Sequence, residues 1–237
     1  MIALVSAALS RFRHWLTRLL GVAAPAPVLA LPSAPTAAAT PDTPDTRATV
    51  HKAGHTLVAW YCTAVTDVYL VSIDVAPEDP RAGFVSYRMA ACPAAWAACT
   101  LVVRLAGLAA ELLAFGTFNA RESGRDLASA REVAEELVSS GRSLPAAWSR
   151  VTGPAPPFAA MFEVAPAPEV AEVLAQAYRV ARALLVASAP RHTALTGSLL
   201  HGRRLVSRDV ERALGSRVGV RLAGLFKSGF VGLEVGS

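Results

Sequence analysis

Two histidines four residues apart, His51 and His55, have the spacing in this chain that most clearly suggests chemistry. On an α-helix, residues at this separation lie on one face, one turn apart, so both imidazoles can point at one metal ion. The same spacing occurs in the H-E-x-x-H signature, in which the histidines bind zinc and the glutamate activates water. Because histidines at this spacing are more often ordinary surface or core residues, the pattern alone is a weak signal.

Lys52 occupies the position that holds the catalytic glutamate in this signature. The glutamate accepts a proton from metal-bound water and later donates it to the leaving amine, which an ammonium group cannot do. A dication also repels an ammonium group, by about 4 kcal/mol for two unit charges about 4 Å apart at an effective dielectric constant of about 20, and by more for a double charge. We therefore expect Lys52 either to turn away from the metal or to act as an unusual, neutral base.

Hydrophobic periodicity and turn residues indicate the elements that must position these side chains. Helices are predicted at 49–65, 94–115, 125–140, 168–189, 192–201 and 207–214, and strands at 67–75 and 83–88. The predicted fold is mainly α-helical, with a small two- or three-stranded β element. Residues 117–124 are predicted to form a loop, from which Glu122 would approach the site as another source of a carboxylate.

Residues 1–46 differ in composition from the rest, and no acidic residue precedes Asp42. Residues 2–20 can form an amphipathic helix with arginines on one side, and residues 25–46 are rich in proline, alanine and threonine. This pattern is typical of a chloroplast or mitochondrial transit peptide, of a helix that contacts a membrane surface through residues 1–20, or of a disordered tail in a bacterial protein. The compartment therefore stays open between an organelle and the bacterial cytoplasm or membrane surface.

Composition limits the remaining function classes. The longest apolar stretch, 94–115, is interrupted by Arg104 and Glu111, so it predicts a buried core helix rather than a membrane span. The net charge is +5, but the arginines are not interleaved with aromatic residues, which argues against binding to nucleic acid. The cysteines are Cys62, Cys92 and Cys99. Their odd number and the lack of a C-x-x-C pair favour buried free thiols over a disulfide or a thiolate zinc site.

The stretch VHKAGHTLVA at 50–59 resembles the V-A-x-H-E-A-G-H-A-L-V segment of the peptidase domain of FtsH-type AAA zinc proteases. Four later segments resemble that family in the same order: the strand-turn-strand at 67–88, AGLAAELLAFG at 106–116, SGRDLASA at 123–130, and the closing helices from 177 to 214. The resemblance covers roughly residues 47–215, which we expect to be the peptidase-like domain. Residues 216–237 would then be a C-terminal tail.

The resemblance implies roles for individual residues. His51 and His55 would be zinc ligands, and Asp126 would be the third ligand, at the start of a helix. Glu111 would be structural, next to a ligand rather than on the metal. Without the resemblance, Asp126 would be an acidic residue stabilised by the positive end of a helix.

Three functions remain open. Lys52 at the base position favours a pseudopeptidase that serves as a binding or regulatory subunit, with protein or peptide ligands or with active FtsH-type AAA protease subunits as partners. The intact set of three ligand positions is compatible with an active, ATP-independent zinc metalloendopeptidase that uses a non-standard base. A metal-free helical scaffold is the third alternative. No G-x-x-x-x-G-K-[ST] sequence occurs, so we expect this chain to carry no ATPase module. It would then act independently of ATP unless it joins a partner ring.

Overall fold

A computed structural model describes residues 41–62, 65–74, 83–89 and 93–215. The amphipathic helix and most of the linker predicted within 1–46, and the tail predicted at 216–237, lie outside the described residues. Within the described part, six α-helices and one three-stranded antiparallel sheet form the domain. The predicted fold class is confirmed.

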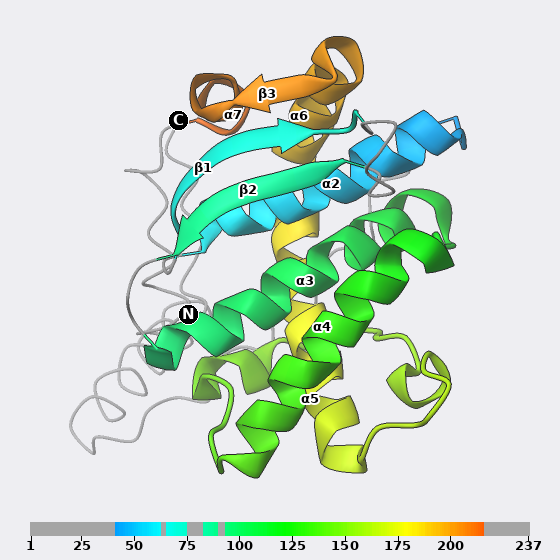
Figure 1. The fold of residues 1–237 in the computed structure, drawn as a ribbon, viewed down its shortest axis with the longest axis vertical. Coiled ribbons are helices and arrows are strands. Elements are labelled where there is room, and N and C mark those ends of the chain that lie inside the picture. The colour runs from blue at the N-terminus through cyan, green and yellow to red at the C-terminus, as the bar shows by residue number, and fades with distance from the viewer. Residues whose placement is uncertain (1–40, 63–64, 75–82, 90–92, 216–237) are drawn as a thin grey trace, which may run out of the picture.

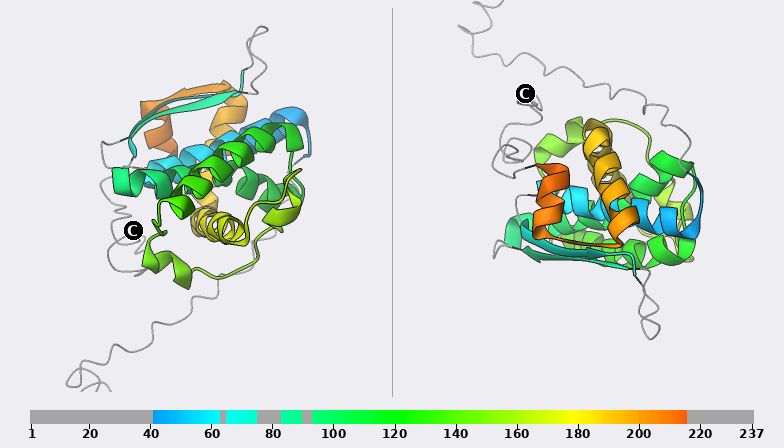
Figure 2. Two further views of the ribbon diagram at one scale, coloured as in Figure 1. Left: turned by 60° about the horizontal axis from the view of Figure 1, so that its bottom comes forward. Right: turned by 90° about the horizontal axis from the view of Figure 1, so that it is seen from above.

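Three of the helices pack around a central helix, α3 Pro93–Phe115 (Figure 1). The α-helices are α2 Pro44–Tyr61, α3 Pro93–Phe115, α4 Ala120–Ser139, α5 Pro168–Ala187, α6 Ala189–Gly202 and α7 Ser207–Leu214, with short 3-10 helices η1 Ala146–Arg150 and η2 Phe158–Ala160. Helix α2 lies between the sheet and α3, and α4 runs beside α3 with α5 behind both. The two further views in Figure 2 show the same layers, with α6 and α7 at the sheet end of the molecule.

The sheet consists of β1 Val65–Ser72, β2 Phe84–Met89 and β3 Arg204–Val206, in the order β2-β1-β3. Strand β1 is antiparallel to both neighbours, with Val68 opposite Tyr87 and Leu70 opposite Val206. The sequence predicted β1 and β2 but not β3, because three residues are too few to show a period-two pattern. In the order β2-β1-β3, strand β2 lies at one edge of the sheet. It also lies beside the predicted metal ligands.

Helix α4 begins five residues earlier than predicted. The Asn119 side chain accepts a hydrogen bond from the backbone N–H of Arg121 at 3.0 Å and caps the helix. Gly124, which suggested a loop, lies inside α4. Glu122 is consequently in the first turn of α4, one turn before Asp126, and the prediction that it lies in a loop is wrong.

Helix α3 is the only described helix that is long and apolar enough to cross a membrane, over Trp96–Phe115 with a mean hydropathy of 1.8. Two-thirds of that stretch is buried inside the protein. Helices α2, α4 and α5 pack against it, and Leu101, Leu105 and Leu108 are almost fully buried. These contacts explain its composition as that of a core helix, as predicted.

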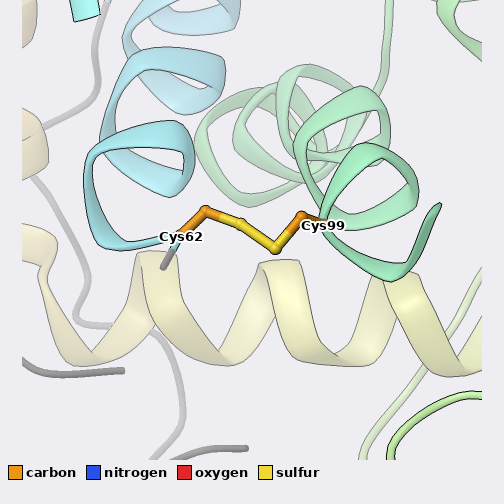
Figure 3. Close-up of a disulfide and its surroundings, with 2 residues drawn as sticks. All are labelled: Cys62 and Cys99. Carbon is orange, nitrogen blue, oxygen red and sulfur yellow. A yellow bond between two sulfur atoms is a disulfide. The ribbon is translucent and has the colours of Figure 1, made fainter. Parts of the chain in front are cut away.

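A disulfide joins Cys62, directly after α2, to Cys99 in the first half of α3 (Figure 3). Their Cα atoms are 6.2 Å apart. The prediction of free thiols is wrong for this pair, whereas Cys92 lies outside the described residues. The two cysteines are 37 positions apart and form no local motif, so only the packing of α2 against α3 brings them together.

Helix α6 packs under α2 and places the partly buried ring of His192 3.4 Å from the Val50 carbonyl oxygen, which accepts a hydrogen bond from Nε2. Burial lowers the pKa of His192 to about 4, and this hydrogen bond only partly opposes the shift. Because the folded-state pKa lies below the ordinary value of 6.5, stability that is complete above pH 6.5 is lost as the pH falls toward 4.

Between pH 7.5 and pH 4, we expect protonation of His192 to lower the free energy of unfolding by about 1–3 kcal/mol. The loss should lie near the lower end of this range, because water screens the charge of a partly exposed ring. A His192→Gln variant keeps an N–H donor but no titrating group, so its loss over the same range should be smaller by that amount. Urea unfolding at both pH values measures the difference. Equal losses in the two proteins would contradict the prediction.

Candidate metal centre

The two histidines lie on the buried face of α2. This helix begins at Pro44, and Thr43 is its N-cap residue. The Thr43 hydroxyl accepts a hydrogen bond from the Thr46 backbone N–H at 3.2 Å, and a proline at the first position loses no helical hydrogen bond. The helix places the imidazoles of His51 and His55 one turn apart, with ring centroids separated by 4.6 Å. Their side chains are 1% and 8% exposed.

Glycines allow α2 and α3 to approach closely beneath the imidazoles. A Cβ atom at Gly54 of α2 would lie 2.7 Å from the Ala106 carbonyl oxygen and from the Ala110 Cβ atom. A Cβ atom at Gly107 of α3 would lie 2.6 Å from the Nε2 atoms of both histidines. The backbone of α3 therefore covers one side of the histidine pair, and this close contact requires glycine in both helices.

Asp126 completes the cluster from α4. Its Oδ2 atom lies 3.0 Å from the Nε2 atom of His51 and 3.0 Å from the Nε2 atom of His55, and the two Nε2 atoms are 2.9 Å apart. Its other oxygen, Oδ1, lies 3.4 Å from Nη1 of Arg104 on α3. The structure therefore brings together all three residues that the resemblance implied as ligands, and this buried group could hold a metal ion.

The hydrogen bonds at the far side of each ring determine the tautomers. The Nδ1 atom of His51 lies 2.6 Å from a carboxylate oxygen of Glu111, and that of His55 lies 2.6 Å from the Val103 carbonyl oxygen. Both partners only accept hydrogen bonds, so both Nδ1 atoms carry a proton and donate it. In the neutral rings, the Nε2 lone pairs then face each other and the Asp126 carboxylate. Three acceptors at this separation need a cation between them.

Hydrogen bonding and burial act in opposite directions on the charges of the cluster. Burial would lower the pKa of His51, but its hydrogen bonds to Asp126 and Glu111 outweigh burial and raise it. Burial lowers the pKa of His55, and the Asp126 carboxylate only partly compensates. Burial would raise the pKa of Asp126, but the two histidines hold it well below its usual range. A metal ion would take the place of a proton held by His51, and Asp126 is already the carboxylate that a metal needs.

Glu111 is a fully buried residue that orients His51. Besides the imidazole, its carboxylate accepts hydrogen bonds from the Asn119 backbone N–H at 2.7 Å and from Nη1 of Arg47 at 3.2 Å. These partners compensate for the burial of a charge. A carboxylate on the far nitrogen of a metal-binding histidine holds the ring in place and makes it a better ligand. This position agrees with the structural role that the resemblance implied.

Lys52 extends beside the cluster toward α4. Its Nζ atom lies 3.6 Å from Oε2 of Glu122, and both side chains are largely buried. The two residues line a cavity of about 250 Å³ together with His55 and Asp126. Two alternatives were predicted for Lys52, namely that it turns away from the metal or acts as a neutral base. Its position corresponds to the first, because its Nζ atom pairs with the Glu122 carboxylate and does not point at the metal ligands.

Sequence reasoning did not identify Val103 or Arg104 as part of the site. A backbone carbonyl such as that of Val103 leaves no signal in a sequence. Arg104 did leave one, because Arg104 and Glu111 are the two charged residues in an otherwise apolar helix, and both contact the cluster. A comparison of the sequence with protein-family models finds no matching family, and a comparison with curated proteins finds no relative.

Proposed function

We propose that this domain binds zinc through His51, His55 and Asp126 and acts as a catalytically impaired relative of the FtsH-type peptidase domain, serving as a binding or regulatory module for proteins or peptides. The observation that carries the proposal is the convergence of two Nε2 lone pairs and one carboxylate oxygen within 3.0 Å of one another. Both imidazoles are held from behind by Glu111 and Val103, as metal-binding histidines usually are.

The donor set fits zinc. Two imidazole nitrogens and one carboxylate oxygen are a common set of three protein ligands, with a fourth position left for water or a ligand. Ligand atoms about 2.0–2.2 Å from a tetrahedral zinc ion are about 3.3 Å apart, so the observed separations of 2.9 and 3.0 Å need only a small outward shift. When bound, zinc would supply a Lewis acid at this site.

Lys52 supports the impaired rather than the active alternative. The proton acceptor of an H-E-x-x-H site follows the first histidine directly, and here that position carries an ammonium group paired with Glu122. Lys52 can donate hydrogen bonds into the cavity but cannot take a proton from water. The charge of Lys52 and its ion pair with Glu122 favour a site that binds a ligand over a site that hydrolyses one.

An active peptidase is the second candidate, and Glu122 is the residue that favours it. Glu122 lines the same cavity as His55 and Asp126, and its carboxylate approaches from α4 rather than from α2. A base there would take over the role that Lys52 cannot perform. The ion pair with Lys52 would have to open for this to happen.

The first test is the zinc content of the full chain, measured by elemental mass spectrometry after dialysis against a zinc buffer. We expect about one zinc per wild-type chain, and a loss of at least about 100-fold in affinity for His55→Ala. His201→Ala is the matched control, because His201 is exposed on α6 and does not belong to the cluster. Absence of zinc from the wild type would leave the metal-free scaffold. Full retention of zinc by His55→Ala would contradict the proposed ligand set, because the metal would then bind elsewhere.

Hydrolysis of a fluorescent casein substrate separates the two zinc-binding candidates. A Lys52→Glu/Glu122→Lys double variant keeps the ion pair with its charges exchanged and places a carboxylate next to His51. We expect it to exceed the wild-type rate by at least about tenfold, since general-base catalysis contributes about 10²–10⁴-fold. Wild-type cleavage that disappears in Glu122→Gln would instead establish the active peptidase.

A further inference from the structure

We propose that the cavity beside the metal centre binds a carboxylate group attached to an apolar body, such as the C-terminal end of a short apolar peptide. The choice of a peptide carboxylate over other oxyanions rests on the proposed function. The positive charge of the cavity is independent of the proposed function, because it comes from side chains of this domain.

Cations outnumber carboxylates around the cavity. Its wall contains four cationic side chains and two carboxylates, and the cations are Lys52, Arg104, Arg121 and Arg125. Both carboxylates already have partners, since Glu122 pairs with Lys52 and Asp126 contacts the histidines. The charge that remains is positive, before any metal ion adds to it.

The arginines retain unused hydrogen-bonding capacity. Arg121 and Arg125 are exposed in the first two turns of α4 and make no ion pair with any residue that the structure describes. The buried Nε atom of Arg104 has no hydrogen-bond partner among the described residues. A buried donor without a partner is costly, and an oxyanion in the cavity would provide acceptors for guanidinium groups.

The apolar part of the wall comes from the edge strand β2. Phe84, Val85 and Tyr87 line the cavity there, and Phe84 is 40% exposed. An exposed aromatic residue next to arginines suits a ligand with a charged end and an apolar end. The volume of about 250 Å³ is smaller than the roughly 300–1,000 Å³ of sites for drug-sized ligands, which limits the enclosed part to about the size of a dipeptide.

The test is isothermal titration of the zinc-equilibrated full chain with two probes, N-acetyl-leucyl-leucine and its C-terminal amide. We expect the free acid to bind at least about tenfold more tightly than the amide, and its binding to weaken with added salt. An Arg121→Gln/Arg125→Gln variant should weaken binding of the acid by about tenfold or more without changing the zinc content. The control is Arg150→Gln/Arg208→Gln, which makes the same charge change at exposed arginines outside the cavity wall.

Equal binding of the acid and the amide, or no effect of the α4 arginines, would overturn the inference. Displacement of the acid by inorganic phosphate at equal concentration would also overturn it, because the apolar wall would then contribute nothing. Zinc content, measured in parallel, separates the two proposals. Arginine-dependent binding of the acid to a chain that takes up no zinc supports the cavity and refutes the metal, and the reverse result refutes only the cavity.

Discussion

A Gly107→Ala substitution is expected to reduce zinc affinity by about 100-fold or more, although Gly107 contributes no ligand atom. The added Cβ atom would lie 2.5 Å from Cε1 of His51 and 2.6 Å from the Nε2 atoms of both histidines, closer than real Cβ atoms come. The imidazoles cannot move aside cheaply, because they are buried and hydrogen-bonded through Nδ1 to Glu111 and to the Val103 carbonyl. Relief of the contact therefore has to displace the Nε2 atoms that would bind zinc.

The same substitution should lower the free energy of unfolding only modestly. Overpacking costs about 1–3 kcal/mol, and the higher helix propensity of alanine returns up to about 1 kcal/mol. Gly197→Ala in α6 is the matched control, because no described atom beyond its own stretch of helix lies within 4 Å of the position where its Cβ would be placed. It should keep zinc affinity and gain up to about 1 kcal/mol. Zinc affinity is measured by competition with a chromogenic chelator, and full affinity in Gly107→Ala would show that the cluster is not the metal site.

Removal of the Cys62–Cys99 disulfide in a Cys62→Ala/Cys99→Ala variant is expected to lower the free energy of unfolding by about 3–4 kcal/mol. The bridge closes a loop across 37 positions, and the chain entropy of the unfolded state rises when a loop of that size is opened. Both residues are buried, so the lost sulfur atoms also leave space in the core. Urea unfolding under non-reducing conditions measures the change.

Reducing agent provides the control. Dithiothreitol should destabilise the wild type by a similar amount and leave the double variant unchanged. Thiol titration of the denatured wild type should detect one thiol, since two of the three cysteines are paired, and three after reduction. Three titratable thiols before reduction would show that the cysteines are free, as composition had suggested.

The disulfide also connects the two helices that build the metal centre. Cys62 follows the helix that carries both histidines, and Cys99 lies one turn before Val103, whose carbonyl oxygen accepts the hydrogen bond of His55. The double variant should therefore bind zinc more weakly than the wild type, but less weakly than Gly107→Ala. The first change loosens the packing of the helices, whereas the second places an atom against the ligands.

Local patterns of the sequence were enough to predict the helical class, β1 and β2, and the common face of His51 and His55. Periodicity, caps and turn residues act over a few positions, so they can be read without knowing the rest of the structure. Their limits are also local. Gly124 was interpreted as part of a loop because the competing cap at Asn119 depends on a side-chain hydrogen bond. The short strand β3 exists only because β1 is beside it.

Only the tertiary structure decided what surrounds the histidines. Asp126 is 71 positions from His55 and Glu111 is 60 from His51, and no spacing rule applies over such distances. The resemblance implied both positions, but their distances and burial come from the packing of α3 and α4 against α2. The pair formed by Lys52 and Glu122 and the Cys62–Cys99 bridge have the same origin. The sequence by itself determined which residues could do chemistry, and the packing of three helices decided which of them meet.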